Sequence, residues 1–351
     1  MKIAIVRGKF LNKYEMQFFE PLAKSFDLTA FGSLTCFHDR FAFPVTKLLS
    51  PMDISFGRPI LNRLFIDAHY LFGLENRLKG FDLVHTAETY FHYTQQCLNA
   101  KRKRYVKKVI ATVLENIPFN NEGIWGRKAF KARARKELDH MIALTNKTKD
   151  ALILEGADPK KITVISHFID TKRFVPALPH HKKLVILFAG RFEKEKGVLD
   201  FIDAARALRN HAVFRMIGDG SLAKHIPSWI ERRKVSYENM PDEYRDADIF
   251  IAPSKPTPTY EEQYCTALLE AQASGLPIVT TRTGGIPENI GDAGIIVEPG
   301  DVPALTASIR SFILNKNKRI FYAKKARHRA LTVHDARIGA KKLAALYTSL
   351  F

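Results

Sequence analysis

Short apolar runs alternate with longer amphipathic segments along the whole chain. In the first half the apolar runs predict strands at residues 2–6, 28–31, 83–85, 109–113 and 142–145. In the second half they predict strands at residues 184–189, 213–217, 248–252, 278–281 and 295–297. Strands that alternate with helical segments are typical of βαβ units, in which the strands run parallel and helices cover them. The pattern therefore predicts an α/β protein.

The length of the chain indicates two domains. One hydrophobic core rarely serves 351 residues, and the Pro and His residues at 176–181, followed by two lysines, interrupt the pattern. We expect an N-terminal domain at residues 1–175 and a C-terminal domain at residues 182–333, each Rossmann-like and doubly wound. The final amphipathic helix, residues 335–351, is expected to pack back on the first domain. Such sheets bind ligands at the carboxyl ends of their strands, which here would face each other across a cleft.

Composition excludes several classes of protein. Hydrophobic residues make up 46% and charged residues 26% of the chain, as in a folded globular protein. No segment approaches the ~20 apolar residues that cross a bilayer, and the first apolar run is too short for a signal peptide. Cys36, Cys97 and Cys265 are scattered, without the spacing of a zinc site or a disulfide framework. These features predict a cytoplasmic protein.

The formal net charge of +19 indicates either an anionic partner or a solvated basic surface. The cations gather at residues 101–108, 127–136 and 316–329, where they could meet an anionic membrane, an anionic acceptor or nucleic acid. Nucleic acid is disfavoured, because no helix-turn-helix, zinc-finger or RNP-like motif accompanies the charge. Phe119, Trp125 and Phe130 interleave with the second cluster, as an interfacial segment requires. The pattern favours a peripheral position on the inner face of the cytoplasmic membrane.

Two glutamates in the second half indicate a binding site. Glu262 and Glu270 lie eight positions apart, the first in a loop and the second in a short helix that Gly275 and Pro277 end. Carboxylates accept hydrogen bonds from sugar hydroxyls, and the free N–H groups at a helix start suit phosphate. Residues 260–288 therefore predict a site for a polyhydroxylated, anionic ligand.

A second polar group follows the predicted strand at residues 184–189. Gly190 allows a ligand to approach the backbone closely, and Arg191 and Lys196 place two cations near the start of the next helix. Two such cations can neutralise a diphosphate and the charge that develops on a leaving group. A surface loop with two ordinary cations is the alternative interpretation.

Together these motifs resemble the retaining GT-B glycosyltransferases of family 4, also called glycosyl transferases group 1. The two glutamates match the E-x7-E signature, and residues 190–197 match the G-R-x-x-x-x-K-G segment. Residues 218–220 are similar to the family's G-D-G turn, and residues 284–288 and 298–301 to its G-G-x-P-E and E-P-G-D endings. The resemblance covers nearly all of residues 183–302.

The resemblance implies a hexosyltransferase that moves a sugar from a nucleotide-diphosphate donor to an acceptor. The two cations would hold the diphosphate, one glutamate would contact the transferred sugar and the other would contact the ribose. The residues with implied catalytic roles are Arg191, Lys196 and Glu262. The residues with implied donor-binding roles are Gly190, Gly218, Thr266, Ala267 and Glu270, the last of these on the ribose hydroxyls.

Two details near Glu262 stay open. A slip of one position would make Glu261 the first glutamate of the signature. The family has G-F-G after that glutamate, whereas this chain has Gln263, Tyr264 and Cys265. Since Gln and Cys restrict the backbone more than Gly does, this departure bears on the identity of the donor sugar.

The first half would carry the acceptor side. The residues that the resemblance assigns to it are Gly8, Lys9, His85, Glu115 and Asn116. His85 ends a predicted strand and could orient the acceptor, with a hydrogen-bonded structural histidine as the alternative. Many relatives carry a histidine where Leu114 and Glu115 stand here, so Glu115 or Asn116 is expected to contact the sugar instead.

Several competing interpretations remain. Asp246 and Asp248 imitate the D-x-D metal motif of another glycosyltransferase architecture, but Asp248 begins an apolar strand, so we expect no metal ion and no other cofactor. The expected acceptor is a glycan or a lipid-linked acceptor of the lipopolysaccharide or polysaccharide kind, in cell-envelope biosynthesis. A GT-B relative that acts as a sugar-nucleotide hydrolase, an epimerase or a phosphorylase is the alternative enzyme. A basic nucleic-acid-binding protein is the alternative of another class.

Overall fold

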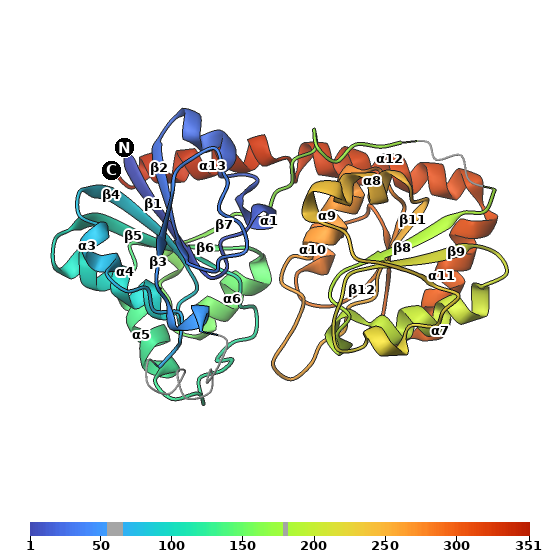
Figure 1. Ribbon diagram of the computed structural model, residues 1–351, viewed down its shortest axis with the longest axis horizontal. Helices are drawn as coiled ribbons and strands as arrows, with labels where there is room; N and C mark the ends of the chain where they lie inside the picture. The colour runs from blue at the N-terminus through green and yellow to red at the C-terminus, as the bar shows by residue number, and fades with distance from the viewer. Residues whose placement is uncertain (55–65, 178–181) are drawn as a thin grey trace. The chain divides into compact units, whose positions relative to one another are not determined.

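The computed structural model describes residues 1–54, 66–177 and 182–351. It divides into two compact units, one formed by Met1–His167 with Gly339–Phe351 and the other by Phe168–Ile338. Each unit contains one parallel sheet with helices packed on it (Figure 1). The predicted fold class, two Rossmann-like doubly wound units, is confirmed.

The first unit contains a seven-stranded sheet in the order β3-β2-β1-β4-β5-β6-β7, and its strand pairs are parallel. The strands are β1 (Lys2–Gly8), β2 (Asp27–Ser33), β3 (Val45–Leu48), β4 (Phe81–Ala87), β5 (Val106–Val113), β6 (His140–Ala143) and β7 (Ile162–Val164). The winding direction reverses between β1 and β4. The carboxyl ends of these two strands therefore form the switch point at which open α/β sheets bind ligands.

Helices cover both faces of this first sheet. They are α1 (Lys13–Met16), α3 (Leu74–Arg77), α4 (His92–Arg102), α5 (Arg127–Glu137), α6 (Asn146–Leu154) and, from Gly339 on, α13 (Ala336–Ser349). Side chains alternate along a strand, so neighbouring residues of β4 enter different layers. Val84 joins a core that includes Leu98 of α4 and Ala134 of α5, whereas His85 meets Tyr347 of α13.

The second unit contains a six-stranded sheet in the order β10-β9-β8-β11-β12-β13, again with parallel pairs. The strands are β8 (Val185–Ala189), β9 (Val213–Ile217), β10 (Glu231–Arg233), β11 (Ile249–Ala252), β12 (Ile278–Thr281) and β13 (Ile295–Val297). The helices are α7 (Val198–Leu208), α8 (Met240–Arg245), α9 (Thr266–Ala273), α10 (Ile286–Ile290), α11 (Val302–Leu314) and α12 (Lys316–Thr332). Here the switch point lies between β8 and β11.

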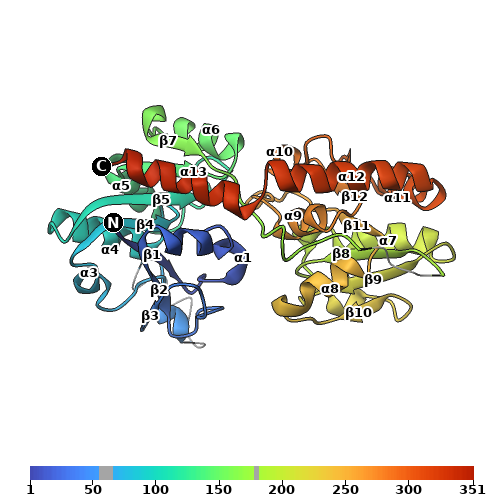
Figure 2. The same ribbon diagram turned by 90° about the horizontal axis from the view of Figure 1, so that it is seen from above.

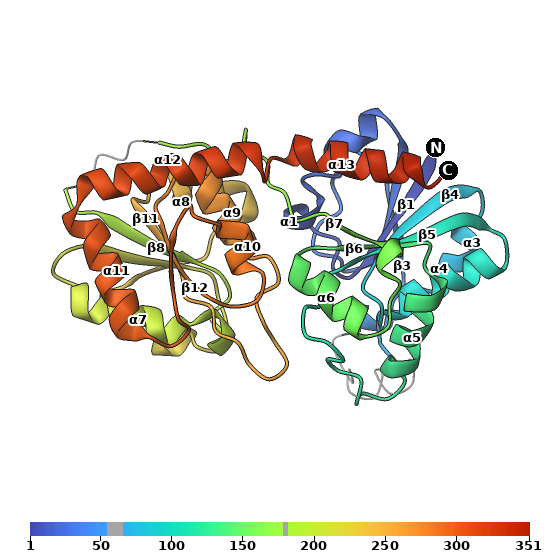
Figure 3. The ribbon, with the colours of Figure 1, turned by 180° about the vertical axis from the view of Figure 1, so that it is seen from behind.

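Alternation along β8 and β11 builds two cores in the second unit. Ile186 and Ile251 belong to a core with α7 and α11, whereas Leu187 and Phe250 belong to a core with α8, α9 and α10. In Figure 1, α7 and α11 lie below the sheet of this unit, and α8 and α9 lie above it. Figure 3 shows the same two layers from behind, with α12 along the upper one. Both faces of the sheet are covered, as a parallel sheet requires.

Side-chain caps start the long C-terminal helices. The Asp301 carboxylate accepts a hydrogen bond from the Ala304 N–H at 2.9 Å and starts α11. Asn315 does the same for the Lys318 N–H at 2.9 Å and starts α12 directly after α11 ends. Each cap satisfies one of the N–H groups that a helix start leaves without a partner.

The observed elements differ from the sequence-based ones in two places. The segment from Phe168 to Phe174 belongs to the second unit, not to a first domain ending at residue 175, because Ile169 pairs with Asp335 and Phe174 lies in the core of that unit. The edge strands β3 and β10 were not predicted, and β10 (Glu231–Arg233) contains no apolar residue that could have indicated it. Most of the predicted polar linker at residues 176–181 lies outside the described residues.

Within the residues that the structure describes, no helix combines the length and the apolar character that a membrane span needs.

Candidate functional site

A buried ion pair lies at the carboxyl edge of the second sheet. Lys196 closes a 3₁₀ turn (Lys194–Lys196) after β8, and Glu262 lies in the loop after β11. The Lys196 Nζ donates to Glu262 Oε1 at 2.9 Å, to Glu262 Oε2 at 2.6 Å and to the Tyr260 hydroxyl at 2.8 Å. The Lys196 side chain is 18% exposed and that of Glu262 is 6% exposed. The sequence placed both residues in one site but did not predict that they bond each other.

Electrostatics keep both members of this pair charged. Burial alone would raise the pKa of the Glu262 carboxyl, but the charge of Lys196 and hydrogen bonds from Lys196 and Ser254 hold it below its ordinary value. Burial opposes the charge of Lys196, yet the negative charge of Glu262 raises the Lys196 pKa. The Ser254 hydroxyl donates to Glu262 Oε2 at 2.8 Å, and the Gly285 N–H donates to the Glu262 carbonyl at 2.7 Å. The carboxylate is therefore fixed in place as well as charged.

Two glycines allow the loops after neighbouring strands to lie close to each other. Gly197 adopts a φ of +68°, and a Cβ there would lie 1.8 Å from the Pro253 carbonyl oxygen. A Cβ on Gly218 would lie 1.9 Å from the Gly190 carbonyl oxygen. Neither position can hold a side chain without moving the backbone. The contact at Gly197 is what brings the turn carrying Lys196 against the loop after β11.

Glu270 lies buried in α9 with one carboxylate oxygen engaged. The Tyr244 hydroxyl donates to Glu270 Oε2 at 2.8 Å, while Oε1 has no hydrogen-bond partner in the described part of the chain. Burial raises the pKa of Glu270 to about 7, against the hydrogen bond from Tyr244, which lowers it. A buried acceptor without a partner is rare and costly, which indicates that a donor from a ligand completes it.

The start of α9 is arranged to receive an anion. Cys265 precedes the helix with a φ of +48°, and within the described residues no side chain caps the first turn. The N–H groups of Thr266 and Ala267 therefore have no side-chain acceptor, and the helix dipole favours negative charge there. Burial and the charge of Glu262 raise the pKa of the Cys265 thiol to about 12, so this neighbour stays neutral.

Arg191 follows β8 at the same carboxyl edge of the sheet, but its side chain is exposed to solvent. Its side chain is 62% exposed, and its guanidinium NH2 lies 3.0 Å from Glu195 Oε1, an ion pair within one turn. Arg191 thus differs from Lys196, which is held in the interior. Gly190 directly follows β8 and Gly218 directly follows β9, so these two predicted donor-side residues lie at the carboxyl ends of neighbouring strands.

The predicted acceptor residues of the first unit have different surroundings. Lys9 Nζ donates to the Thr35 carbonyl at 2.5 Å and to the Thr35 hydroxyl at 2.6 Å, just after Gly8 ends β1. Glu115 accepts from the Ile117 N–H at 3.0 Å and from the Asn120 side chain at 2.7 Å. These residues and the buried Asn116 follow β1 and β5, on either side of β4 in the sheet order.

His85 is a structural histidine. It is fully buried, with Nδ1 2.6 Å from the Tyr347 hydroxyl and Nε2 2.7 Å from the Thr112 hydroxyl. Burial and the nearby charge of Arg7 lower its pKa well below the ordinary value. Both ring nitrogens are engaged, so the structure favours the alternative interpretation, and we no longer assign His85 to the acceptor.

Glu88, for which the sequence indicated no role, lies directly after β4. Its φ of +58° is rare for a residue with a side chain. Glu88 Oε1 accepts from the N–H groups of Leu114 and Glu115 at 2.9 and 3.2 Å, while Oε2 has no hydrogen-bond partner among the described residues. Burial, together with the charge of Glu115, raises the pKa of Glu88 to about 8. Its backbone strain and unsatisfied oxygen are the signs of a functional residue.

Three further polar residues were also missed. Asp67 lies 3.0 Å from His69 Nδ1 and 3.3 Å from the Arg127 guanidinium, and these two neighbours hold the Asp67 pKa below its ordinary value although burial would raise it. His69 Nε2 is buried with no hydrogen-bond partner in the described ranges. No sequence signal could have indicated this group, because its members belong to no motif and Arg127 lies 60 positions after Asp67.

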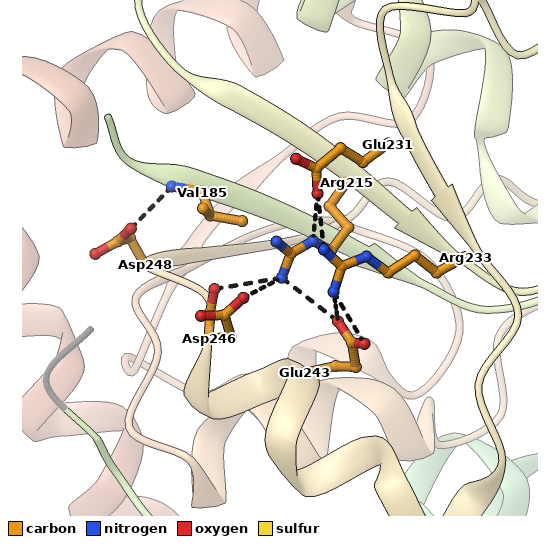
Figure 4. Close-up of polar contacts among 7 residues, drawn as sticks. All are labelled: Val185, Arg215, Glu231, Arg233, Glu243, Asp246 and Asp248. Atoms are coloured by element: carbon orange, nitrogen blue, oxygen red, sulfur yellow. Dashed lines mark hydrogen bonds and ion pairs between the residues drawn. The ribbon is translucent and has the colours of Figure 1, made fainter. Parts of the chain in front are cut away.

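Asp246 and Asp248 both have structural partners (Figure 4). Asp246 Oδ2 lies 2.7 Å from the buried Arg215 guanidinium, which also pairs with Glu231 at 2.8 Å. Asp248 Oδ2 accepts from the Val185 N–H at 2.8 Å and so fixes the start of β8. These contacts explain both carboxylates without a metal ion. Among the residues that the structure describes, no cluster of His, Cys, Asp and Glu could hold a metal.

Comparison with known proteins identifies the family. The model described as "Glycosyltransferase Family 4" matches residues 39–173, and the model described as "Glycosyl transferases group 1" matches residues 183–315. The first of these models covers most of the first unit and the second covers most of the second unit, so together they span most of the chain. The chain belongs to glycosyltransferase family 4, glycosyl transferases group 1.

Curated relatives agree with this family. A glycogen synthase from Mycobacterium tuberculosis is 29% identical over 225 residues, covering 60% of this chain and 54% of the relative. The putative colanic acid biosynthesis glycosyltransferase WcaL from Salmonella typhimurium is 30% identical over 197 residues, covering 50% of this chain and 47% of the relative. The chain therefore spans about half the length of the curated relatives it matches.

Solved structures agree with the fold. Sucrose-phosphate synthase from Thermosynechococcus elongatus is similar with a TM-score of 0.80 at 18% identity, covering 100% of this chain and 99% of that one. Anabaena HepE in complex with UDP-glucose has a TM-score of 0.76 at 15% identity, covering 99% and 100%. WaaG, a glycosyltransferase of lipopolysaccharide biosynthesis, has a TM-score of 0.70 at 17% identity, covering 98% and 99%. The fold is GT-B.

Proposed function

We propose that the protein is a retaining glycosyltransferase that moves a hexosyl group from a nucleotide-diphosphate donor to a hydroxyl of a glycan or lipid-linked acceptor. One observation carries this proposal. The carboxyl edge of the second sheet combines the fixed, charged Lys196–Glu262 pair with Glu270, whose Oε1 has no hydrogen-bond partner among the described residues. Positive charge and free carboxylate acceptors are the two features that a nucleotide sugar requires.

The geometry of the site supports the following donor-side roles. Glu270 Oε1 accepts a ribose hydroxyl, because it is a buried acceptor that needs a donor. Lys196 and Arg191 face the diphosphate together with the N–H groups of Thr266 and Ala267 at the start of α9. Glu262 contacts hydroxyls of the transferred sugar. When the donor binds, its diphosphate shares Lys196 with Glu262, so the pair orients two groups of one ligand.

The reaction exchanges one bond of the sugar for another. The bond between the anomeric carbon and the diphosphate oxygen breaks, and the acceptor oxygen forms a bond to the same carbon on the same face. The acceptor proton moves to the departing phosphate. Lys196 and Arg191 stabilise the negative charge that grows on that phosphate, which is typically the largest catalytic contribution in such a site. Because these cations and the start of α9 supply the positive charge, we propose that the reaction requires neither a metal ion nor another cofactor.

The acceptor belongs to the first unit in this proposal. Lys9 and Glu115 lie after strands that flank β4, and Glu88 lies after β4 itself. With its pKa raised to about 8, Glu88 is largely protonated at neutral pH and can donate a hydrogen bond as well as accept one. An acceptor rich in hydroxyl groups can both donate to and accept from the protonated Glu88 carboxyl, so it suits this site better than an anionic acceptor would.

The names of relatives indicate the kind of biosynthesis in which this activity takes part. WcaL is named for colanic acid biosynthesis and WaaG for lipopolysaccharide biosynthesis. These names support a role in cell-envelope polysaccharide biosynthesis, with the enzyme in the cytoplasm and peripheral on the inner face of the membrane. The HepE structures hold UDP and UDP-glucose, so a UDP-sugar is the first donor to test.

A thermal-shift panel of UDP-, GDP- and ADP-sugars tests the donor. One series should raise the melting temperature by mass action, since a ligand that binds the folded state stabilises it. The selected donor is then incubated with and without an acceptor glycan. Sugar transfer that depends on the acceptor supports the proposal. Rapid release of free sugar without acceptor would indicate a sugar-nucleotide hydrolase, and binding of RNA without any nucleotide sugar would indicate a nucleic-acid-binding protein.

A further inference from the structure

The three basic clusters of the chain differ in how far their charges are neutralised. In residues 101–108, which hold six cations, five have a carboxylate partner. The ion pairs are Lys101–Asp139 at 2.7 Å, Arg102–Glu137 at 2.5 Å, Lys103–Glu75 at 2.5 Å, Lys107–Asp82 at 2.6 Å and Lys108–Asp139 at 3.4 Å. Four carboxylates, with Asp139 shared by two lysines, therefore neutralise much of the charge of this cluster.

The second cluster, on α5, is similar. Four of its six cations are paired: Arg127 with Asp67 at 3.3 Å, Lys131 with Glu155 at 2.5 Å, Arg133 with Glu137 at 3.1 Å and Arg135 with Glu155 at 2.7 Å. Lys131 and Glu155 are both buried, so this pair is part of the interior. The sequence suggested that the first domain carries a free basic face, but most of that charge serves internal ion pairs.

The third cluster, residues 316–329 on α12, has much less compensation among the described residues. Residues 302–334 contain eight Lys or Arg residues and no Asp or Glu. Within the described residues, the ion pair recorded for these eight is Lys325 with Asp292, at 2.6 Å. Arg319, Arg327 and Arg329 donate to backbone carbonyl oxygens, which satisfy their hydrogen bonds without neutralising their charge. Residues 302–334 therefore contribute +8 to the formal net charge of +19, and a smaller share of their cations has a carboxylate partner than in the other two clusters.

The outer face of α12 also exposes apolar side chains. Positions 317, 320, 321, 324, 328 and 331 recur every three or four residues, which places them on one face of the helix, and all six are exposed. On that face Ile320 is 43% exposed, Phe321 55% and Leu331 43%. On the opposite face, Ala326 and Ala330 are buried where α12 packs beside α9 (Figure 2). The helix is thus fixed to its unit by one face and presents Ile320, Phe321, Lys324 and Leu331 on the other.

We infer that the outer face of α12 docks the protein on an anionic lipid bilayer. In this position Ile320, Phe321 and Leu331 enter the boundary between headgroups and acyl chains, while Lys316 and Lys324 meet lipid phosphates. The exposed apolar residues favour a bilayer over a nucleic acid, whose phosphate backbone offers them no apolar surface. Because residues 302–334 contain no Asp or Glu, the basic surface of α12 is complementary to anionic lipid. This surface does not depend on the transfer reaction, and it lies on the second unit instead of on the cluster of α5.

Co-sedimentation with lipid vesicles tests this inference. The full chain is mixed with phosphatidylcholine vesicles, with or without phosphatidylglycerol, and the bound fraction is measured. We expect strong binding only with phosphatidylglycerol. Lys316→Gln with Lys324→Gln should weaken that binding roughly 25-fold, at about fivefold per cation. Ile320→Ser with Phe321→Ser should weaken it without changing its salt dependence, since no charge is altered. Ser has a helix propensity close to that of Ile and Phe, so α12 should persist.

Matched substitutions in the first unit serve as controls. Lys128→Gln with Lys136→Gln removes the same charge from exposed positions of α5, and Trp125→Ser removes an aromatic side chain that is 65% exposed. These variants should bind vesicles like the wild type. Equal loss from the α5 variants, or no loss from the α12 variants, would overturn the inference. So would tighter binding to RNA than to anionic vesicles. Donor-induced thermal shifts, measured on every variant, separate this outcome from failure of the proposed transferase activity.

Discussion

Two buried glutamates, one in each unit, lie just beyond strand ends and have opposite electrostatics. Glu262 in the second unit bonds Lys196, and its pKa is held below the ordinary value. Glu88 in the first unit has no cation bonded to it among the described residues, and burial raises its pKa to about 8. Both side chains are almost fully buried, so burial alone does not decide the charge state. This difference in charge supports the proposed division of roles, with an anionic donor bound by the second unit and a neutral, hydroxyl-bearing acceptor bound by the first.

The strongest way to break this comparison is to remove the cation of the second unit. Lys196→Ala should lower turnover on the order of 10²–10³-fold, because the leaving diphosphate loses its main electrostatic partner. It should also cost about 3–5 kcal/mol of unfolding free energy, because Glu262 is left buried and unpaired. Chemical denaturation and steady-state kinetics measure the two effects.

Two further variants separate activity from folding. Lys194→Ala alters an exposed lysine of the same turn and should leave both quantities unchanged. Adding Glu262→Gln to Lys196→Ala should restore much of the stability, since the unpaired charge is removed, but should not restore turnover. Wild-type turnover in folded Lys196→Ala protein would refute the role of this cation.

Arg191→Ala sharpens the comparison within the second unit. Arg191 is 62% exposed and forms a surface ion pair with Glu195, so its loss should leave the melting temperature unchanged. Turnover should still fall on the order of 10²-fold if Arg191 meets the diphosphate. Arg206→Ala, which removes a similarly exposed arginine paired with Asp203, is the control for a general loss of surface charge. Equal kinetics in the two variants would count against Arg191.

The pH dependence of donor binding tests Glu270. Its pKa of about 7 means that the carboxylate becomes fully charged only as the pH rises through that value. Hydrogen bonds to a charged acceptor are stronger than those to a neutral one, so donor affinity should increase several-fold across this range. Glu270→Gln should bind more weakly and show no such increase. A donor affinity that is flat with pH in the wild-type protein would contradict the assignment.

A further prediction concerns the stability of the first unit. The pKa of Glu88 is raised from 4.5 to about 8 on folding, so the folded state holds a proton that the unfolded state releases. This contribution is fully present below about 4.5 and is lost as the pH rises through about 8. Glu88→Gln, which stays neutral, should therefore gain stability relative to the wild type as the pH rises, by several degrees in melting temperature. Glu298→Gln, at an exposed carboxylate, should show no such trend.

Sequence reasoning succeeded where the chemistry is contiguous in the chain. The strands β8, β9, β11, β12 and β13 were visible as apolar runs, and the donor-side residues follow those runs in recognisable motifs. The unpredicted β10 contains only charged residues and joins the sheet by backbone pairing with β9, which leaves no hydrophobic signal.

Contacts between distant residues could not be predicted. The Lys196–Glu262 pair joins positions 66 apart, and the hydrogen bond that defines His85 joins positions 262 apart. Only the folded sheet brings such residues together. The same limit applies to Asp67, His69 and Arg127, and to the ion pairs that neutralise the basic residues of the first unit.

Isothermal titration of the selected nucleotide sugar into wild-type, Glu261→Gln and Glu270→Gln protein tests the central claim most directly. If the carboxyl edge of the second sheet is the donor site, Glu261→Gln should bind like the wild type, because Glu270 and Glu262 form the signature pair. Glu270→Gln should bind roughly tenfold or more weakly, the cost of one hydrogen bond to a charged group. Equal affinity for Glu270→Gln and wild type would contradict the account, as would a wild-type protein that binds no nucleotide sugar.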